Sequence, residues 1–310
     1  MKLFRGFAVA SAVLALAIAV LGSWVRINNA GLTCPDWPLC NGRLVPTLEG
    51  GVVLEWSHRL VAFIEGFVVM GAIVTGFRAR KCIAGVSPTL VALGVVFLIQ
   101  VSLGGATVLL ANSPMSVMLH WGVGMLLLAT LTTLAVLATL APPRPLSRAA
   151  TASAAPALGV AAAFAFATMC VGAYVSSSYA GLACASVPAC DGTLLGHSPA
   201  QLVQMVHRLA AFAFAIVATI ATIVAYQNDS VRVRACATLA LGLVALQIAL
   251  GIGNVIWHLP TAMREAHAAN ACATFLAFVM AMVFATLDPV RVTVAATERP
   301  RAAARIASNA

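Results

Sequence analysis

Eight long apolar stretches alternate with shorter polar connections along the chain. They cover roughly residues 7–25, 56–77, 89–111, 116–141, 154–178, 201–226, 235–257 and 264–287. A helix needs about 20 apolar residues to cross the hydrocarbon core of a bilayer. The first stretch follows Lys2 and Arg5 and could pass for a secretory signal, but its length and the seven later spans favour a retained helix. We therefore predict an all-α integral membrane protein with eight transmembrane helices.

The second half of the chain repeats the first. Several motifs recur at offsets of 147 to 150 residues: Ala30-Gly31-Leu32-Thr33-Cys34 as Ala180-Gly181-Leu182-Ala183-Cys184, His58-Arg59-Leu60 as His207-Arg208-Leu209, Gln100 and Gly104 as Gln247 and Gly251, and His120 as His267. Four crossings return the chain to its starting side, so both halves have one orientation. Such a parallel repeat predicts two tandem four-helix bundles related by a pseudo-two-fold axis along the membrane normal.

Four segments are expected along the chain. An N-terminal four-helix half covers 1–141, a cytoplasmic linker 142–153, a C-terminal four-helix half 154–288, and a disordered basic cytoplasmic tail 289–310. The prolines Pro142, Pro143 and Pro145 mark the linker.

Composition and charge agree with this organisation. Of the 310 residues, 62% are hydrophobic and 9% charged, which excludes a soluble globule. The net charge of +9 would suggest a nucleic-acid partner in a soluble protein, but here thirteen of the eighteen Lys and Arg residues lie in alternate connections and at the two ends. Because positive residues stay on the cytoplasmic side, we predict two cytoplasmic termini, contact of the tail with anionic lipid, and no nucleic-acid partner.

Four histidines stand a few residues inside the outward ends of their spans: His58, His120, His207 and His267. A single one could simply bond a neighbouring helix, but an ionisable residue in a span is by default functional, and these four match in the repeat. Each half carries one on its second helix and one on its fourth, which is how bundles build cofactor sites. Two imidazoles per site suit haem iron, whereas zinc would need three or four ligands.

Two arginines follow directly after histidines of the quartet. Arg59 and Arg208 would meet haem propionates at the outward end, since Arg pairs well with carboxylates. The alternative is an arginine that extends to the membrane interface. Arg264 is a weaker candidate of the same kind.

The halves differ beside the first histidine. Glu55 stands three residues before His58 and shares its face, whereas Gln204 takes the matching position before His207. A carboxylate there could act as a base or stabilise developing positive charge, or could simply favour a helix N-terminus. The difference suggests that the first half performs chemistry and the second keeps a permanent cofactor.

Cysteine pairs lie in the two large outward loops. An oxidising exterior favours the disulfides Cys34–Cys40 and Cys184–Cys190, with thiol exchange to a partner protein as the alternative.

Together these residues resemble the haem A synthase family, of the bacterial type with cysteine pairs in the outer loops. The resemblance rests on the duplicated bundle, Glu55, the four histidines, the two arginines and the loop cysteines. It implies oxidation of a ring methyl of haem O to a formyl group, which supplies haem A for terminal oxidase biogenesis. It also implies the bacterial cytoplasmic (inner) membrane as location and a haem O synthase upstream.

The resemblance also distributes the roles. His58, His120 and Arg59 would bind the substrate haem O in the first half, and Glu55 would be catalytic. His207, His267 and Arg208 would hold a haem b cofactor in the second half. The electron acceptor and homo-oligomerisation are left open.

Other functions are compatible with part of this pattern. A non-catalytic bis-His diheme b-type cytochrome that only carries electrons is the main alternative. A transporter is disfavoured because the ionisable residues cluster at one depth near the outer face, with no polar path to the cytoplasm. A disulfide-generating membrane protein is allowed by the cysteines but does not require the histidine quartet.

Overall fold

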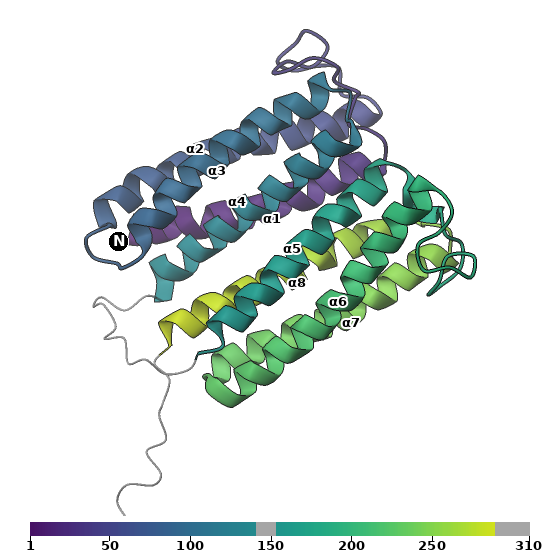
Figure 1. Ribbon diagram of the computed structural model, residues 1–310. Helices are drawn as coiled ribbons and strands as arrows, with labels where there is room; N and C mark the ends of the chain where they lie inside the picture. Colours follow the sequence, from purple (N-terminus) through teal and green to yellow (C-terminus); the bar gives the residue numbers. More distant parts are fainter. Residues whose placement is uncertain (141–152, 289–310) are drawn as a thin grey trace, which may run out of the picture.

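The computed structural model describes residues 1–140 and 153–288, which form a bundle of long antiparallel helices (Figure 1). The helices are α1 (Lys2–Ile27), α2 (Gly51–Ala79), α3 (Val86–Leu109), α4 (Pro114–Leu140), α5 (Ala155–Ser177), α6 (Pro199–Asn228), α7 (Val231–Ile256) and α8 (Thr261–Leu287), with the short turn η1 (Ala180–Leu182) after α5. Each helix overlaps one predicted span, with ends that differ by a few residues. The eight-helix prediction is therefore confirmed, whereas residues 142–152 of the predicted linker and the predicted tail at 289–310 lie outside the described residues.

The helices end at repeat-matched positions with left-handed backbone. Asn29 (φ 54°) follows α1 and Tyr179 (φ 58°) follows α5; Asn112 (φ 53°) follows α3 and Leu259 (φ 61°) follows α7. A left-handed residue cannot continue an α-helix, because such a helix is strained for L-residues. The two halves thus leave their helices by the same path, although the residue types differ.

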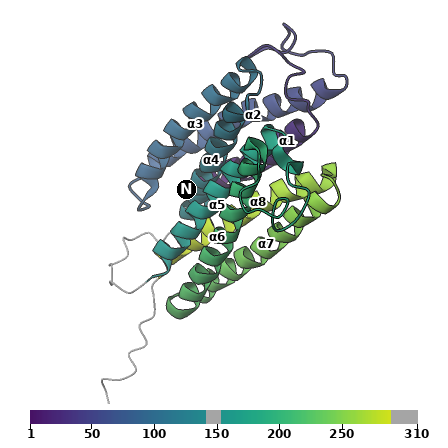
Figure 2. The ribbon, with the colours of Figure 1, turned by 45° about the vertical axis from the view of Figure 1, so that its right-hand side comes forward.

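The two halves pack about a pseudo-two-fold axis. In the first half α1 packs on α2 and α4, and α3 packs on α4 with a thinner contact to α2; α5 to α8 repeat this pattern. The halves meet through α1, α4, α5 and α8 (Figures 1 and 2). Exchange of the two halves converts the α4–α5 contact into the α8–α1 contact and leaves the α4–α8 contact unchanged. This is the contact pattern of a two-fold axis, as predicted.

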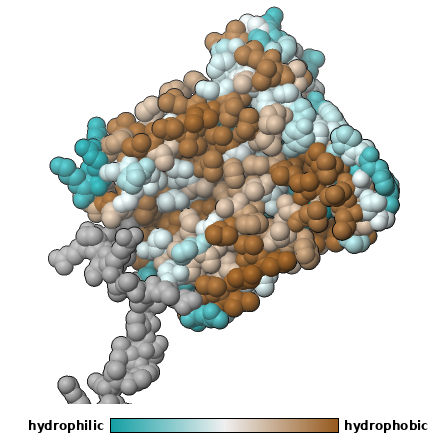
Figure 3. All heavy atoms as spheres, viewed as in Figure 1, coloured by the Kyte–Doolittle hydropathy of each residue, from teal (hydrophilic) through white to brown (hydrophobic). Residues whose placement is uncertain are grey.

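The outer helices present apolar side chains at the surface. Phe63 and Phe67 on α2 are each 65% exposed, and Leu98 on α3 is 68% exposed. In the space-filling view such residues form a broad band, with hydrophilic residues gathered at the two ends (Figure 3). The helices are long and apolar enough to cross a membrane. The protein is therefore a multi-pass integral membrane protein whose band faces lipid.

The two ends of the bundle are built differently. One end, called here the loop end, carries residues 28–50 and 178–198; the other, the terminal end, carries the N-terminus and the short turns after α2 and α6 (Figure 1). At the terminal end the buried Asp229 accepts a hydrogen bond from the backbone N–H of Ala154 at 2.8 Å, which ties α5 to the end of α6. Burial raises the pKa of Asp229. That the terminal end faces the cytoplasm stays a prediction.

A first prediction concerns the packing of α2 against its neighbours. A Cβ on Gly76 would stand 2.8 Å from both Leu90 and Phe4, and both residues are only 1% exposed, so neither has room to move. Gly76→Ala should lower the free energy of unfolding in detergent by about 1–3 kcal/mol, the usual cost of an overpacked core.

The matched control is Gly94 on α3, where an added Cβ meets nothing within 4 Å. Gly94→Ala should be neutral or stabilise by up to ~1 kcal/mol through helix propensity. Equal stability of the two variants would contradict the packing described for α2.

Candidate functional site

The four predicted histidines lie in two pairs at the loop end, one pair in each half. His58 on α2 and His120 on α4 belong to helices that both pack against α1 and α3. His207 on α6 and His267 on α8 form the equivalent pair. The structure thus brings two imidazoles to the loop end of each half; that each pair binds one haem stays a prediction.

Each imidazole rests on a glycine of the preceding helix. A Cβ on Gly22 would stand 2.9 Å from Cε1 of His58, and one on Gly172 would stand 2.8 Å from Cε1 of His207. The second histidine of each pair has the same support: the corresponding distances are 3.2 Å from Gly104 to His120 and 3.3 Å from Gly251 to His267. Only a residue without a side chain lets the ring lie so close to the neighbouring backbone. The glycines therefore set the position of all four rings.

The surroundings of Nδ1 are the same in all four imidazole rings. In every one Nδ1 is enclosed in protein and has no hydrogen-bond partner among the described residues. The backbone beside it, at Ile18, Gln100, Thr168 and Gln247, falls short of hydrogen-bond geometry. An imidazole that binds iron through Nε2 usually donates its Nδ1–H to a neighbouring acceptor, and the backbone beside each ring would take that part here. The arrangement fits axial ligation of a planar metal group. By contrast, no three His, Cys, Asp or Glu residues of the described segments are grouped to hold a bare metal ion.

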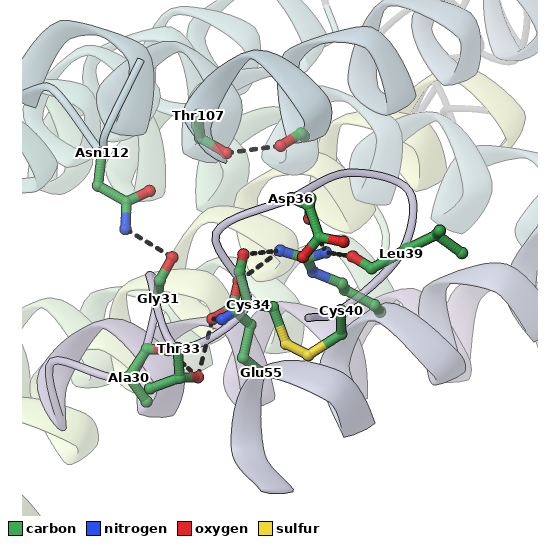
Figure 4. A network of polar contacts seen from close by, with 12 residues as sticks. Ala30, Gly31, Thr33, Cys34, Asp36, Leu39, Cys40, Glu55, Thr107 and Asn112 are labelled. Carbon is green, nitrogen blue, oxygen red and sulfur yellow. Dashed lines mark hydrogen bonds and ion pairs between the residues drawn. A yellow bond between two sulfur atoms is a disulfide. The ribbon is translucent and has the colours of Figure 1, made fainter. Parts of the chain in front are cut away.

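The first outward loop is fixed by Arg59. Its guanidinium donates to the carbonyls of Cys34 (2.7 Å), Asp36 (2.6 Å) and Leu39 (2.6 Å), and to Oε1 of Glu55 (2.6 Å). Figure 4 shows these loop residues gathered around the disulfide. Of its five N–H groups only Nε–H has no partner among the described residues. A contact of Arg59 with a haem propionate therefore stays a prediction, and the arginine's visible role is to hold the loop.

Glu55 is buried beneath the same loop. Besides the ion pair with Arg59, its Oε2 accepts hydrogen bonds from the Thr33 hydroxyl at 2.9 Å and the Cys34 N–H at 2.8 Å (Figure 4). Only 4% of the residue is exposed. The carboxylate is thus fully engaged in anchoring the disulfide loop to α2.

The second half uses an amide for the same anchor. Oε1 of Gln204 accepts from the Cys184 N–H at 2.6 Å, and its Nε2 donates to the Gly181 carbonyl at 2.8 Å. Arg208 donates to the carbonyls of Ser186 and Cys184 at 2.7 and 3.1 Å, and no acidic side chain of the described residues pairs with it. Loop anchoring therefore does not require a carboxylate. The halves differ in charge, because Arg59 is neutralised and Arg208 is not.

Both predicted disulfides are confirmed. Cys34 is bonded to Cys40 and Cys184 to Cys190, and each bond closes a short loop at the loop end. In the first loop the carboxylate of Asp36 accepts from the N–H groups of Gly42 and Asn41. These bonds, that of Gly42 foremost, lower the pKa of Asp36.

Several polar residues inside the bundle were not predicted as site residues from the sequence. Glu65 lies on α2 below His58, and both its carboxylate oxygens are buried without a hydrogen bond among the described residues. Between the halves, Arg26 of α1 donates to Ser176 of α5 and interacts with Arg264 and Glu265 of α8. Charged residues inside apolar spans were the signal that could have identified them.

The weaker candidate Arg264 belongs to this inter-half cluster. Its guanidinium donates to the Ile27 carbonyl at 3.4 Å, at the end of α1. It therefore lies between the two histidine pairs rather than over either loop.

Comparison with known proteins gives one consistent result. The model of the cytochrome oxidase assembly protein family, COX15-CtaA, matches residues 5–52 and 48–279. The chain is 30% identical to a haem A synthase of Bacillus licheniformis, over 86% of this chain and 91% of the relative. It is 28% identical to a haem A synthase of Shewanella oneidensis, over 86% and 92%. A third such relative, from Geobacillus thermodenitrificans, is 27% identical over 85% and 86%.

A second prediction follows from the loop contacts. Arg59→Gln should speed reduction of the Cys34–Cys40 disulfide at least about tenfold, because each lost bond to a charged group contributes roughly 1.5–3 kcal/mol. The measurement is the rate of thiol alkylation by mass spectrometry during treatment with a phosphine reductant. The control Arg43→Gln removes an exposed loop arginine whose side chain bonds none of the described residues and should leave the rate unchanged. Equal rates for both variants would show that Arg59 does not hold the loop closed.

Proposed function

This chain belongs to the cytochrome oxidase assembly protein family, COX15-CtaA, and on that premise we propose that it is a membrane-bound haem A synthase that converts haem O to haem A. The relatives that carry this name align over most of both chains. The observation that carries the proposal is the pair of repeat-related imidazole sites, each backed by glycines and each suited to one haem. The reaction oxidises a ring methyl of the substrate to a formyl group.

We assign the permanent cofactor, haem b, to His207 and His267. The support is the charge of the second half: Arg208 has no acidic partner among the described residues, so an anionic cofactor would find compensation there. When bound between two imidazoles, a haem supplies one-electron chemistry. The protein's own contribution is to hold both rings against Gly172 and Gly251, so that little reorganisation accompanies electron transfer.

We assign the substrate haem O to His58 and His120. In this half the positive charge of Arg59 is already paired with Glu55, so the site holds an anionic ligand less strongly, as an exchangeable substrate requires. The disulfide loop over α2 covers the site at the loop end and limits access of water. Product and substrate can then exchange without loss of the resident cofactor.

Glu55 contributes through its charge. The sequence left open whether this residue is a base or an electrostatic stabiliser. Its two oxygens accept three hydrogen bonds, including one from a guanidinium, so both are already engaged in holding the loop. Relative to Gln204, Glu55 cancels the positive charge of the neighbouring arginine, so positive charge that develops on the substrate is opposed less in the first half.

A diheme electron carrier is the second candidate. The near equivalence of the four histidine–glycine contacts favours it, since an electron carrier needs two similar fixed haems. The charge difference between Glu55 and Gln204 favours the enzyme.

The location and partners extend the same proposal. We place the protein in the bacterial cytoplasmic membrane with both termini inside, because positive residues gather at the terminal end and in its turns. A haem O synthase would supply the substrate, and terminal oxidases would use the product.

Analysis of extracted pigments distinguishes an enzyme from an electron carrier. Cells that express the chain together with a source of haem O should accumulate haem A, detected by chromatography of extracted pigments. Glu55→Gln should keep the fold and the haem b but lower haem A formation roughly 100-fold, the usual loss when one preorganised electrostatic group is removed. Glu49→Gln, at an exposed position of the loop that precedes α2, is the control and should form haem A normally. Absence of haem A from the wild type would refute the enzyme.

The assignment of the halves has its own test. His207→Ala or His267→Ala should abolish the low-spin haem absorbance of the purified protein, because the resident haem loses an axial ligand. His58→Ala should retain most of it, and the exposed loop variant His197→Ala should retain all of it. Loss of all bound haem in His58→Ala would reverse the assignment.

A further inference from the structure

The first half contains a buried acidic residue, Glu65, that has no role in the reaction proposed above. Glu65 is 3% exposed, and both oxygens of its carboxyl group are enclosed without a hydrogen-bond partner among the described residues. Burial of a polar group without a partner is unfavourable, and burial of a charge far more so, so this side chain is best accommodated as the neutral acid. A buried acid of this kind in a membrane bundle calls for a functional explanation.

Glu65 shares the inward face of α2 with His58. The two are seven residues apart, so their side chains point in nearly the same direction. The same face continues through Ala72 and Gly76, both in the interior, where Gly76 meets α1 and α3. Because α2 runs from the loop end to the terminal end, Glu65 lies roughly 10 Å deeper in the bundle than His58.

The second half has no acid at this place. The His58–His207 offset of 149 residues makes Phe214 the counterpart of Glu65. Phe214 is 6% exposed, and its ring packs edge-on against Phe278 of α8 with centroids 5.8 Å apart. An aromatic ring thus takes the position on α6 beneath His207, where α2 has a carboxyl group beneath His58.

This difference matches the chemistry of the two haems assigned to the two sites. Haem O carries a hydroxyl group on the carbon that attaches its isoprenoid chain to the ring, where haem b carries an apolar vinyl group. If the propionates point to the loop end, this substituent points toward the terminal end, where Glu65 lies below His58. A neutral carboxyl both donates and accepts one hydrogen bond, as an alcohol does.

We propose that Glu65 is a specificity-determining residue of the substrate site, whose buried carboxyl group hydrogen-bonds the hydroxyl beside the isoprenoid chain of haem O. Phe214 makes the equivalent position on α6 apolar and suited to haem b. The inference rests on the proposed function, and it adds the group by which the first site distinguishes substrate from cofactor.

The test isolates the hydroxyl group from the isoprenoid chain. Purified protein with haem b in the second half is titrated with iron haematoporphyrin, which has hydroxyethyl groups, and with iron mesoporphyrin, which has ethyl groups. Binding at the first site is followed by the change in Soret absorbance. The wild type should prefer the hydroxyethyl compound, and Glu65→Leu should reduce the ratio of the two dissociation constants roughly tenfold.

Two variants complete the experiment. Glu65→Gln keeps the ability both to donate and to accept a hydrogen bond and should retain most of the preference. Phe214→Leu makes a matched apolar change at the repeat position and should leave the ratio at the first site unchanged. Helix content and retained haem b, measured by circular dichroism and absorbance, show that each variant is folded.

The outcomes separate this inference from the proposed function. A Glu65→Leu protein with the wild-type ratio overturns the inference, even if it loses turnover, since that result would make Glu65 a proton carrier or a structural residue. If the wild type forms haem A but never discriminates the two porphyrins, the inference fails and the enzyme stands. If the wild type forms no haem A, the proposed function fails.

Discussion

Contact between an imidazole and the bare backbone of a neighbouring helix is the interaction on which both sites depend. Gly22 and Gly172 on α1 and α5 support one ring of each pair, and Gly104 and Gly251 on α3 and α7 support the other. Apolar side chains gain little from association in lipid, so helices in membranes approach most closely where small residues permit it. Here the close approach serves to immobilise a polar ring at a fixed depth. The loops, arginines and carboxylates are arranged around rings that are already in place.

The repeat shows how one scaffold supports two different environments. Glu55 and Gln204 perform the same anchoring of a cysteine N–H, yet only one of them is charged. Glu65 and Phe214 occupy the same layer, yet only one can form hydrogen bonds. The backbone path, the disulfides and the glycine contacts stay equivalent in the two halves. Differences in two side chains therefore suffice to give the halves distinct electrostatics and polarity without a change in fold.

The fold was predictable because membranes impose strong rules on sequence. Length of the apolar stretches and the repeat offsets defined the helices and their pseudo-symmetry, and the loop cysteines indicated both disulfides. The surroundings of Arg59 were not predictable, because its partners are mainly backbone carbonyls, which any residue type provides. The sequence shows Glu65 as an acid within an apolar span. The repeat pattern marks only positions where the two halves carry similar residues, and Glu65 and Phe214 differ. The sequence shows that Gly104 and Gly251 are equivalent in the repeat. Their role could not be predicted from it, because it depends on a contact between two helices.

Helix α1 belongs to both sites. It supplies Gly22 to the first histidine pair and packs on α8, which carries His267 of the second pair. A displacement of α1 that accompanied occupancy of one site would be transmitted to the other, and linkage would make the effect reciprocal: each occupant would alter the affinity of the other by one common factor. Exchange of one ligand and retention of the other would then be thermodynamically connected events, governed by a single helix.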